Sequence, residues 1–558
     1  MNQTRTFLIL AWLMVAFLLW SEWNKERLVP PAASGQAPAA IQAPAISAPA
    51  VGRPASAVPT MGPAAVNPGA QAFTAPQATP GLVTVTTDVL RLQLDGTSVR
   101  RAELLAYPQE RGVNNQPVAL LSEDPARFAT VRSGWIGDNG GELAFVPEQA
   151  PTESSLAPGQ DALELKYVAR GPDGLRVHRT WRVKRGSYAI AVEDTVVNAG
   201  GTPWQGTVYR QAARVPPTGK SGFTNPESFT LSGAAWYSPE DKYDKRKFAD
   251  FIDDGPLDKQ VTGGWVALSQ HYFLVAWVPQ KDQPALFALS SNGPVHAIEA
   301  RGPRFAVAPG QQLSSNASLW LGPKLAEQLD ATAPGLGLAM DYGIFTVLSK
   351  PIHWTLTQLH KITGNWGWAI VLLVVVIKLL LYPLSAAQYK SMAKMRKFQP
   401  RIEQLKERYG EDKQKFQMAM LELYKKEKIN PAGGCLPILI QMPVFLALYY
   451  VLLEAVELRQ AIWIPGWVDD LTARDPFFVL PVLNGAIMWL TQKLSPTPGM
   501  DPMQKKMLQM MPVVMAVMFA FFPAGLVLYW VTNGALGLLQ QWWMTRLYAE
   551  APEKPAKA

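Results

Sequence analysis

One lysine stands inside an apolar run of the C-terminal third of the chain. Lys378 is flanked by Val374–Ile377 and Leu379–Leu381, within the stretch Trp366–Ser385. A lysine at the centre of a membrane-spanning helix costs about 2.5–3.5 kcal/mol. Snorkelling from a helix end would avoid this cost, but a span that ended at Lys378 would measure only ~18 Å, whereas the bilayer core measures about 30 Å. We therefore expect the helix to continue toward Pro383 and Lys378 to face a hydrated cavity in a helical bundle.

Other polar side chains fall inside the neighbouring apolar stretches. They are Gln441, Asn484, Thr491, Thr532, Asn533 and Gln540. An amide or hydroxyl in a membrane commonly joins two helices, so these residues fit either a polar cavity or helix packing. Glu454 and Glu457 fall at the far end of their stretch, so no carboxylate lies mid-span to neutralise Lys378. We expect an unpaired cation of this kind to attract acidic polypeptide segments.

Motifs of nucleotide-driven motors and metalloenzymes are missing from the sequence. Gly219-Lys220-Ser221 is similar to the end of a phosphate-binding loop, but that motif requires glycine where Arg214 stands. There is no HExxH, and the five histidines are scattered along the chain. The single cysteine, Cys435, excludes an intramolecular disulfide. The sequence predicts a protein that is not an enzyme and has no cofactor or metal.

The composition indicates a membrane part joined to a soluble part. The 558 residues suggest about two to four units. Charged residues make up 17% and hydrophobic residues 48%, and that charged share lies well below the usual quarter. The mean hydropathy is nevertheless only +0.01. The apolar residues must therefore be concentrated in one part of the chain.

Six apolar stretches approach the roughly 20 residues that cross a bilayer core. They are Phe7–Trp20, Trp366–Ser385, Gly434–Leu453, Pro476–Thr491, Met507–Phe522 and Gly525–Trp543. Bulky and charged residues follow the first stretch, which favours an uncleaved signal anchor over a cleaved secretory signal. We predict a multi-domain, six-span α-helical membrane protein in which the last five spans form a bundle.

Charge in the short loops predicts the orientation, because loops rich in Lys and Arg stay in the cytoplasm. Between the second and third stretches, twelve Lys and Arg face six Asp and Glu. This loop and both termini are therefore predicted to be cytoplasmic. Pro400, Gly410 and Asn430-Pro431 divide the loop into two amphipathic pieces, which predicts a helical hairpin over residues 388–430.

The hairpin carries most of the excess charge of the chain, whose net charge is +8. Its candidate contact residues are Lys390, Lys394, Arg396, Arg401, Arg408 and Lys425. A solvated loop that only sets the membrane topology is an equal alternative. Since the charge lies at the membrane surface, we do not predict direct binding of nucleic acid.

Residues 81–335 alternate apolar and polar side chains in short runs between turn signals such as Asp95-Gly96. This pattern predicts an all-β sandwich on the periplasmic side of a bacterial inner membrane. A Pro/Ala-rich tether over residues 25–80 connects it to the anchor over residues 1–24. Residues 336–361 fit either an amphipathic interfacial helix or a buried helix of the sandwich. The remaining parts are the five-span bundle, residues 362–546, and a cytoplasmic tail, residues 547–558.

The C-terminal motifs resemble the YidC insertase family, in that family's order. They are Ile377-Lys378-(x)3-Tyr382-Pro383-Leu384, Gln388 to Met395, Asn430 to Pro437, Gln441 to Phe445, Glu457 to Gln460, Asp501 to Gln504 and Phe522 to Trp530. The anchor, tether and sandwich resemble the long Gram-negative form in architecture.

The resemblance implies an insertase of the YidC/Oxa/Alb group that uses no ATP. It implies nascent membrane proteins as clients, handled alone or beside the SecYEG translocon in the lipid bilayer, with the ribosome as a further candidate partner. The family's groove cation is usually arginine, so Lys378 keeps the charge but loses the bidentate fork. The family's client-contacting side chains on the last span match Tyr529 and Trp530. A hydroxyl one turn before the cation matches Val374 and is not carried over.

Two other classes of function fit parts of the sequence. A secondary transporter would need inverted repeats, and no two halves match in hydropathy. A membrane-anchored periplasmic domain that binds carbohydrate or lipid rests only on the adhesive roles of other sandwiches. Deleting the sandwich distinguishes this class from an insertase. Insertion should survive the deletion if the C-terminal bundle carries the function, and it should fail if the sandwich does.

Overall fold

The computed structural model describes residues 82–111, 115–149, 153–217, 230–251, 253–409, 412–427, 436–494 and 502–549. The predicted anchor at Phe7–Trp20, the Pro/Ala-rich tether and the C-terminal tail beyond residue 549 lie outside the described residues. The sandwich and the helices that follow it belong to one compact unit, Ala75–Phe251 with Pro256–Ala558.

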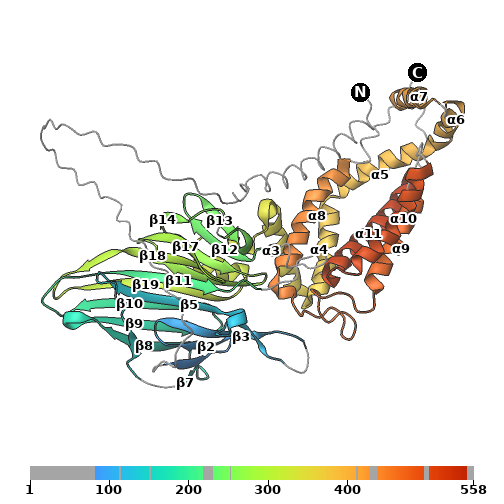
Figure 1. Ribbon diagram of the computed structural model, residues 1–558. Helices are drawn as coiled ribbons and strands as arrows, with labels where there is room; N and C mark the ends of the chain where they lie inside the picture. Colours follow the sequence, from blue (N-terminus) through green and yellow to red (C-terminus); the bar gives the residue numbers. More distant parts are fainter. Residues whose placement is uncertain are drawn as a thin grey trace, which may run out of the picture. The chain divides into compact units, whose positions relative to one another are not determined.

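Two β-sheets form the N-terminal part of this unit (Figure 1). The ten-stranded sheet has the order β14 (Asp258–Thr262), β17 (Pro284–Asn292), β18 (Val295–Val307), β11 (Trp204–Arg214), β5 (Ala129–Gly137), β3 (Ser98–Pro108), β2 (Leu90–Leu94), β1 (Val83–Thr86) and β7 (Glu153–Ser155), with β4 (Pro117–Leu121) beside β3. The nine-stranded sheet has the order β13 (Lys242–Lys247), β12 (Gly233–Ser238), β15 (Trp265–Ser269), β16 (Phe273–Pro279), β19 (Gln312–Pro323), β10 (Ala189–Asn198), β9 (Leu175–Lys184), β8 (Ala162–Arg170) and β6 (Phe145–Pro147).

Alternation along the strands explains why the sheets stack. In β10 every second residue is buried, and its neighbours β9 and β19 pair with it in antiparallel register. The inward side chains fill one core that includes fully buried Trp135, Trp181 and Trp277. The predicted all-β sandwich is confirmed.

A buried ion pair crosses this core. Arg179 of β9 places two guanidinium nitrogens 2.6 and 2.7 Å from the carboxylate oxygens of Asp194 on β10. Arg179 also donates to the carbonyls of Gly96 and Ser133, and Trp135 donates to Asp194. Because Ser133 and Trp135 belong to β5 of the other sheet, the pair joins the two layers.

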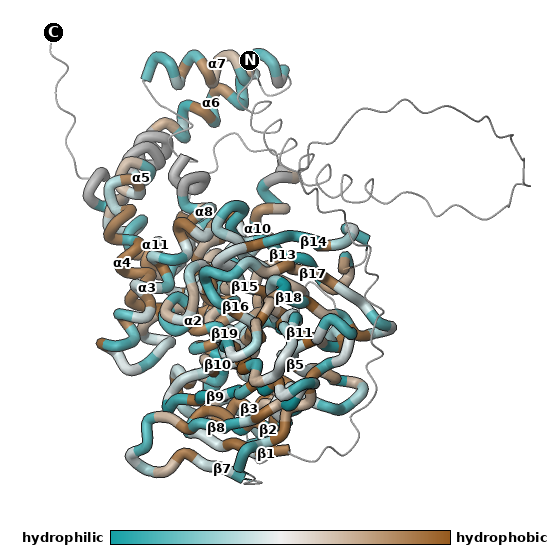
Figure 2. Tube along the Cα trace, turned by 90° about the vertical axis from the view of Figure 1, so that its left-hand side faces the viewer, coloured by the Kyte–Doolittle hydropathy of each residue, from teal (hydrophilic) through white to brown (hydrophobic). Residues whose placement is uncertain are grey.

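The second half of the chain is helical. Its helices are α2 (Ala326–Thr332), α3 (Thr346–Thr363), α4 (Trp366–Leu380), α5 (Tyr382–Lys397), α6 (Gln399–Tyr409), α7 (Lys413–Lys426), α8 (Leu436–Glu454), α9 (Val479–Leu494), α10 (Pro502–Phe519) and α11 (Ala524–Ala549). Figure 2 shows a largely hydrophobic α4, whereas α6 and α7 mix hydrophilic and hydrophobic residues.

Helix α4 ends earlier than the sequence suggested. It stops at Leu380, two residues after Lys378, and the chain bends by 66° into α5. Pro383 accounts for the break at Leu381, because proline cannot donate a hydrogen bond to the preceding turn and clashes with its carbonyl, whereas it fits the first turn of a new helix. Lys378 therefore lies in the last turn of α4, and the apolar stretch continues past Pro383 only as a bent pair of helices. The expectation that one membrane span extends beyond Lys378 stays a prediction.

None of the described helices is, taken alone, both long and apolar enough to cross a membrane. The bent pair of Trp366–Leu380 and Tyr382–Tyr389 meets that requirement by length and composition. The prediction of six spans stays a prediction.

Helix α3 combines an exposed apolar side with a side buried against other helices. Val347 and Trp354 are exposed, while Ser349, His353 and Leu356 are buried. The Ser349 hydroxyl donates to the Ala447 carbonyl of α8 over 3.1 Å. The helix thus packs on the bundle and keeps apolar side chains exposed.

The sandwich is joined to α8 by a buried ion pair. Lys324, directly after β19, places Nζ 3.0 Å from Oε2 of Glu454, the last residue of α8, and both side chains are excluded from solvent. His271 Nε2 lies 2.8 Å from the Leu453 carbonyl, so the neutral imidazole donates to the end of the same helix. Farther along, Arg459 donates to the Gln109 carbonyl.

This junction predicts a pH dependence of stability. Burial lowers the pKa of His271 from 6.5 to about 4, and the positive charges of Lys324 and Arg459 add to the shift against the hydrogen bond to Leu453. The unfolded chain then binds the extra proton, so stability is complete above pH 6.5 and is lost as the pH falls toward 4. Because the ring is partly exposed, we expect a loss of about 1–2 kcal/mol.

The measurement is the thermal unfolding of the native chain and of His271→Gln between pH 7 and pH 4.5. Glutamine keeps an N–H donor but does not titrate, so the variant should show a smaller decline in melting temperature. Identical declines in the two chains would contradict the assignment.

Candidate functional site

The Lys378 side chain lies between α4 and α11. It is half-buried, and within the described parts of the chain it has no hydrogen bond or ion pair. A Cβ atom built on Gly537 of α11 would stand 3.5 Å from the Lys378 Nζ. The predicted cation is therefore shielded by helices and not neutralised by a described carboxylate.

Two of the predicted amides meet each other. Gln441 of α8 donates from Nε2 to the Asn533 Oδ1 of α11 across 3.5 Å. This contact joins two helices, as the packing alternative for these residues predicted. Both side chains remain partly exposed, so the pair is also accessible to another polar group.

Two other predicted residues interact within their own helices. Asn484 is buried in α9 and its amide contacts the Met488 sulfur at 3.7 Å. The Thr532 hydroxyl donates to the Leu528 carbonyl one turn earlier in α11. Contact of either residue with Lys378 stays a prediction.

The predicted client-contacting aromatic residues lie in a ring cluster. Tyr529 and Trp530 of α11 stand with their ring centroids 5.9 and 4.7 Å from that of Phe445 on α8. Trp530 also packs against Phe519 of α10 at 5.5 Å. Tyr529 is buried and Trp530 is partly exposed. The cluster therefore joins α8, α10 and α11, and Trp530 lies at its edge.

A loop between α8 and α9 covers the N-terminal ends of α4 and α11. The Asn365 amide, beside the first residue of α4, donates to the Trp463 carbonyl over 3.0 Å. The Gly525 amide of α11 donates to the Leu471 carbonyl over 2.8 Å. The Trp463 ring lies directly on Gly367, where a Cβ would meet it at 2.2 Å. The loop therefore closes this end of the bundle.

Asp475 holds the loop and was missed by the sequence analysis. Its buried carboxylate accepts from the Trp467 indole and from the backbone amides of Phe477 and Leu480. The available signal was an aspartate directly before the apolar stretch Pro476–Thr491, which is a usual pattern at the start of a helix.

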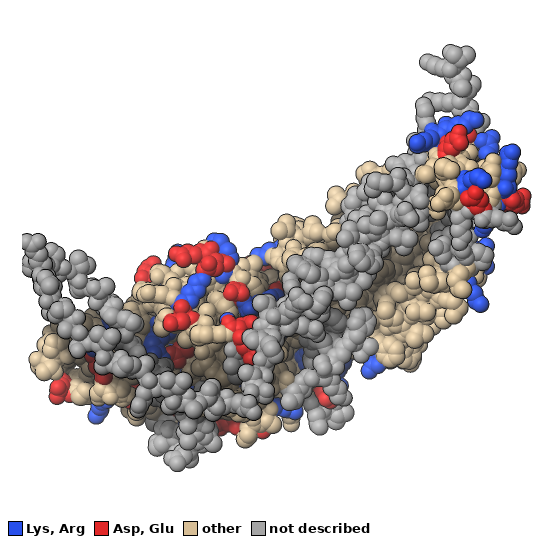
Figure 3. Space-filling model, turned by 45° about the horizontal axis from the view of Figure 1, so that its top comes forward, with Lys and Arg blue, Asp and Glu red and all other residues tan. Residues whose placement is uncertain are grey.

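The described part of the hairpin predicted over residues 388–430 contains α6 and α7, which pack against each other. Ile402 and Tyr424 are buried between the two helices, with Phe416 among the residues packed on them. Of the predicted contact residues, Arg401 pairs with Glu427 at 2.9 Å, Arg408 lies near the Tyr409 ring, and Lys425 is exposed. The side chains of Lys390, Lys394 and Arg396 lie outside the described residues. Figure 3 shows Lys and Arg gathered at this end, among some acidic residues.

Apolar side chains cover the outer surfaces of α9 and α10. Val482 and Leu483 of α9 are exposed, as are Met507, Val513 and Val517 of α10. In Figure 3, much of the described surface between the hairpin and the sandwich carries no charged residue. Exposed apolar side chains in this number are typical of a surface that contacts a membrane or another protein.

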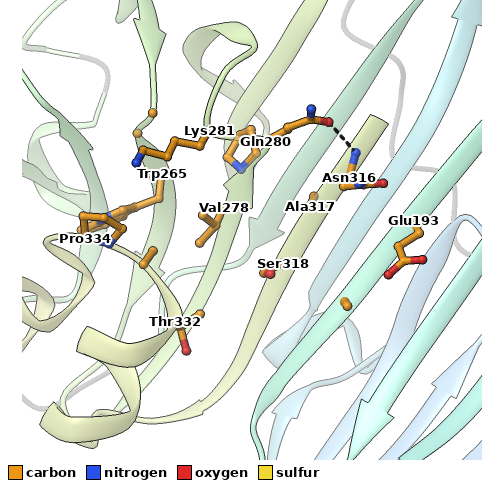
Figure 4. Close-up of a pocket in the computed structure, with 15 residues that line it drawn as sticks. Glu193, Trp265, Val278, Gln280, Lys281, Asn316, Ala317, Ser318, Thr332 and Pro334 are labelled. Carbon is orange, nitrogen blue, oxygen red and sulfur yellow. Dashed lines mark hydrogen bonds between the residues drawn. The ribbon is translucent and has the colours of Figure 1, made fainter. Parts of the chain in front are cut away.

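The sandwich contains a cavity of about 340 Å³ that lies apart from Lys378. Its lining includes Glu193, Trp265, Lys281 and Thr332, and the Gln280 side-chain Oε1 there accepts from the backbone N–H of Asn316 (Figure 4). The mixture of charged, polar and aromatic side chains does not define one class of ligand.

Comparisons with known proteins define the class and then the family. Residues 358–551 match the model described as 60Kd inner membrane protein and residues 82–355 match the YidC periplasmic domain, so the chain is an inner-membrane protein with a periplasmic domain. A membrane protein insertase YidC of Xanthomonas campestris is 54% identical over 572 residues, covering 100% of both chains. Another, from Stenotrophomonas maltophilia, is 54% identical over 99% of this chain and 98% of its own. The chain belongs to the YidC family of membrane protein insertases.

A solved structure of an active YidC insertase with its first transmembrane domain resolved covers 83% of this chain and 94% of its own, at 19% identity and a TM-score of 0.36. Family membership, which rests on the sequence matches, confirms the prediction of a non-enzymatic insertase of the inner membrane. The span count, the orientation of the termini and the roles of single residues stay predictions.

Proposed function

We propose that residues 362–546 form a client groove that is open to the cytoplasm and to lipid and closed toward the periplasm, with Lys378 inside it. The observation that carries this proposal is the half-buried Lys378 ammonium beside Gly537, without a described ionic partner. The loop that holds Asn365 and Gly525 supports closure at the opposite end.

In this proposal the chain crosses the inner membrane six times, with both termini and the α6–α7 hairpin in the cytoplasm. The excess of Lys and Arg in the hairpin supports that orientation. The hairpin receives ribosome-borne chains, and the insertase acts alone on small clients and beside SecYEG on larger ones. These partners come from the family resemblance.

Charge attraction and apolar transfer drive insertion without ATP. A short acidic tail of the client enters the groove, where Lys378 and the Gln441–Asn533 pair reduce the cost of removing its polar groups from water. The client's apolar segment moves along the apolar surface of α8 and α11, with Trp530 at its edge, and gains about 25 cal/mol per Å² on entering lipid. The membrane potential favours export of the acidic tail. The short helices α9 and α10 thin the bilayer locally.

The test is reconstitution in liposomes with a single-span client that carries an acidic N-terminal tail. Lys378→Ala should slow its insertion about tenfold, equivalent to ~1.4 kcal/mol of lost attraction. Lys378→Arg keeps the charge and should retain most of the rate. A matched client with Asp→Asn replacements in the tail should lose less than about twofold in the alanine variant, because its tail has no charge to attract. An equal loss with both clients, or none with either, would contradict the proposed role.

A further inference from the structure

Gly537 of α11 lies beside the Lys378 ammonium. The built Cβ position is 3.5 Å from the Lys378 Nζ and 4.0 Å from the Tyr389 hydroxyl, which is ordinary contact distance. A longer side chain that pointed in this direction would meet the ammonium or the phenol. A glycine inside a helix costs about 1 kcal/mol relative to alanine, so its presence here calls for a packing reason.

The same residue provides a backbone acceptor that is already engaged. The Tyr389 hydroxyl of α5 donates to the Gly537 carbonyl across 3.1 Å. The bond joins α11 to α5, which follows α4 after a bend of 66° and packs against α11. Without the phenol, the Gly537 carbonyl would lose this donor, and the Lys378 ammonium beside the same residue could donate in its place.

A second donor without a partner lies one turn farther along α11. Gln540 is three residues beyond Gly537, on the same helical face, and its buried Nε2 has no hydrogen bond within the described part of the chain. Lys378 and Gln540 can both donate, and the Gly537 carbonyl already accepts from Tyr389. An ammonium and an amide N–H that both lack a described acceptor suit a group that accepts hydrogen bonds, such as a carboxylate.

We propose that Gly537 and Tyr389 are positioning residues that keep the Lys378 ammonium available: the glycine leaves it space beside α11, and the tyrosine hydroxyl occupies the backbone carbonyl that would otherwise bind it. The expected occupant is a carboxylate of the client tail. This last step rests on the proposed groove, whereas the positioning does not.

The positioning is tested by a stability cycle on the full chain in detergent. Gly537→Asp places a carboxylate within reach of Lys378, so it should be tolerated far better with Lys378 present than together with Lys378→Met. We expect the loss in melting temperature to be at least ~4 °C smaller with the lysine. Gly534→Asp is the matched control on the same helix, because a Cβ there meets the Ile487 side chain at 3.0 Å. Its loss should not depend on Lys378, and equal losses for Gly537→Asp in both backgrounds would overturn the proposal.

The role of Tyr389 is tested by insertion into liposomes of the acidic-tailed client and its Asp→Asn counterpart. Tyr389→Phe keeps the ring but frees the Gly537 carbonyl, so the ratio of acidic to neutral insertion rates should fall about threefold. A loss that arises only from disturbed packing would lower both rates and leave the ratio unchanged.

Suppose that Lys378→Ala lowers the ratio of acidic to neutral insertion rates to about one and Tyr389→Phe leaves this ratio unchanged. The role of Tyr389 is then refuted, while the proposed function stands. If Lys378→Ala leaves the ratio unchanged, the proposed function fails. The stability cycle then still decides the positioning by Gly537, because it does not depend on insertion.

Discussion

A chain that carries Lys324→Met is expected to lose about 3–5 kcal/mol of stability at the junction between sandwich and bundle. The substitution leaves the Glu454 carboxylate buried without its ammonium partner, which lies 3.0 Å away in the native chain. Methionine matches the length of the lysine stem, so the loss should come from the uncompensated charge and not from a cavity.

Limited proteolysis and hydrogen exchange at Lys324, at the end of α8 and around Arg459 are the measurements, since release of the junction should expose these segments first. In the double variant Lys324→Met with Glu454→Leu, most of the loss should be recovered, because no charge stays buried. Lys361→Met is a surface control: its pair with Glu327 is exposed, so less than ~0.5 kcal/mol should change. If proteolysis and hydrogen exchange at the junction were as fast in the double variant as in Lys324→Met, the unpaired buried charge would not be the cause of the lost stability.

The Arg179→Met variant is expected to destabilise the sandwich itself. Asp194 would keep its bond from Trp135 but lose both guanidinium contacts in a fully buried site, at a cost of about 3–5 kcal/mol. The carbonyls of Gly96 and Ser133 would lose their donor as well. We expect the melting temperature of the sandwich to fall by ~10 °C.

Arg182 offers a matched control on the same strand. Its pairs with Glu164 and Glu193 are partly exposed, so Arg182→Met should change stability by less than ~1 kcal/mol. Circular dichroism during heating follows the β-structure in both variants. Equal melting temperatures for Arg179→Met and Arg182→Met would contradict the role of the buried pair in joining the two sheets.

Periodicity explains why the sandwich was predictable. Strands such as β9 and β10 alternate buried and exposed residues because one face meets a core and the other meets solvent. That information is local, so it predicts the strands and the class of fold. It does not predict which strands pair, nor that Arg179 meets Asp194 between the sheets.

The candidate site was predictable in its chemistry but not in its contacts. A charged residue within an apolar run is visible in one segment, so Lys378 follows from sequence alone. Which residues surround Lys378 depends on the bend between α4 and α5. That bend arises because Pro383 interrupts the regular helix. Tyr389 and Gly537 are 148 residues apart, and nothing local connects them.

The amino-acid sequence by itself determined the β-sandwich, the positions of the apolar stretches, the basic hairpin and the presence of one lysine in an apolar run. These properties depend on side chains a few residues apart, which share a face of one strand or helix. The tertiary structure alone decided that Lys378 lies beside a glycine and Tyr389, that Lys324 is buried with Glu454, and that a loop held by Asp475 covers the bundle. Such contacts join distant segments, and the packing of the whole chain selects them.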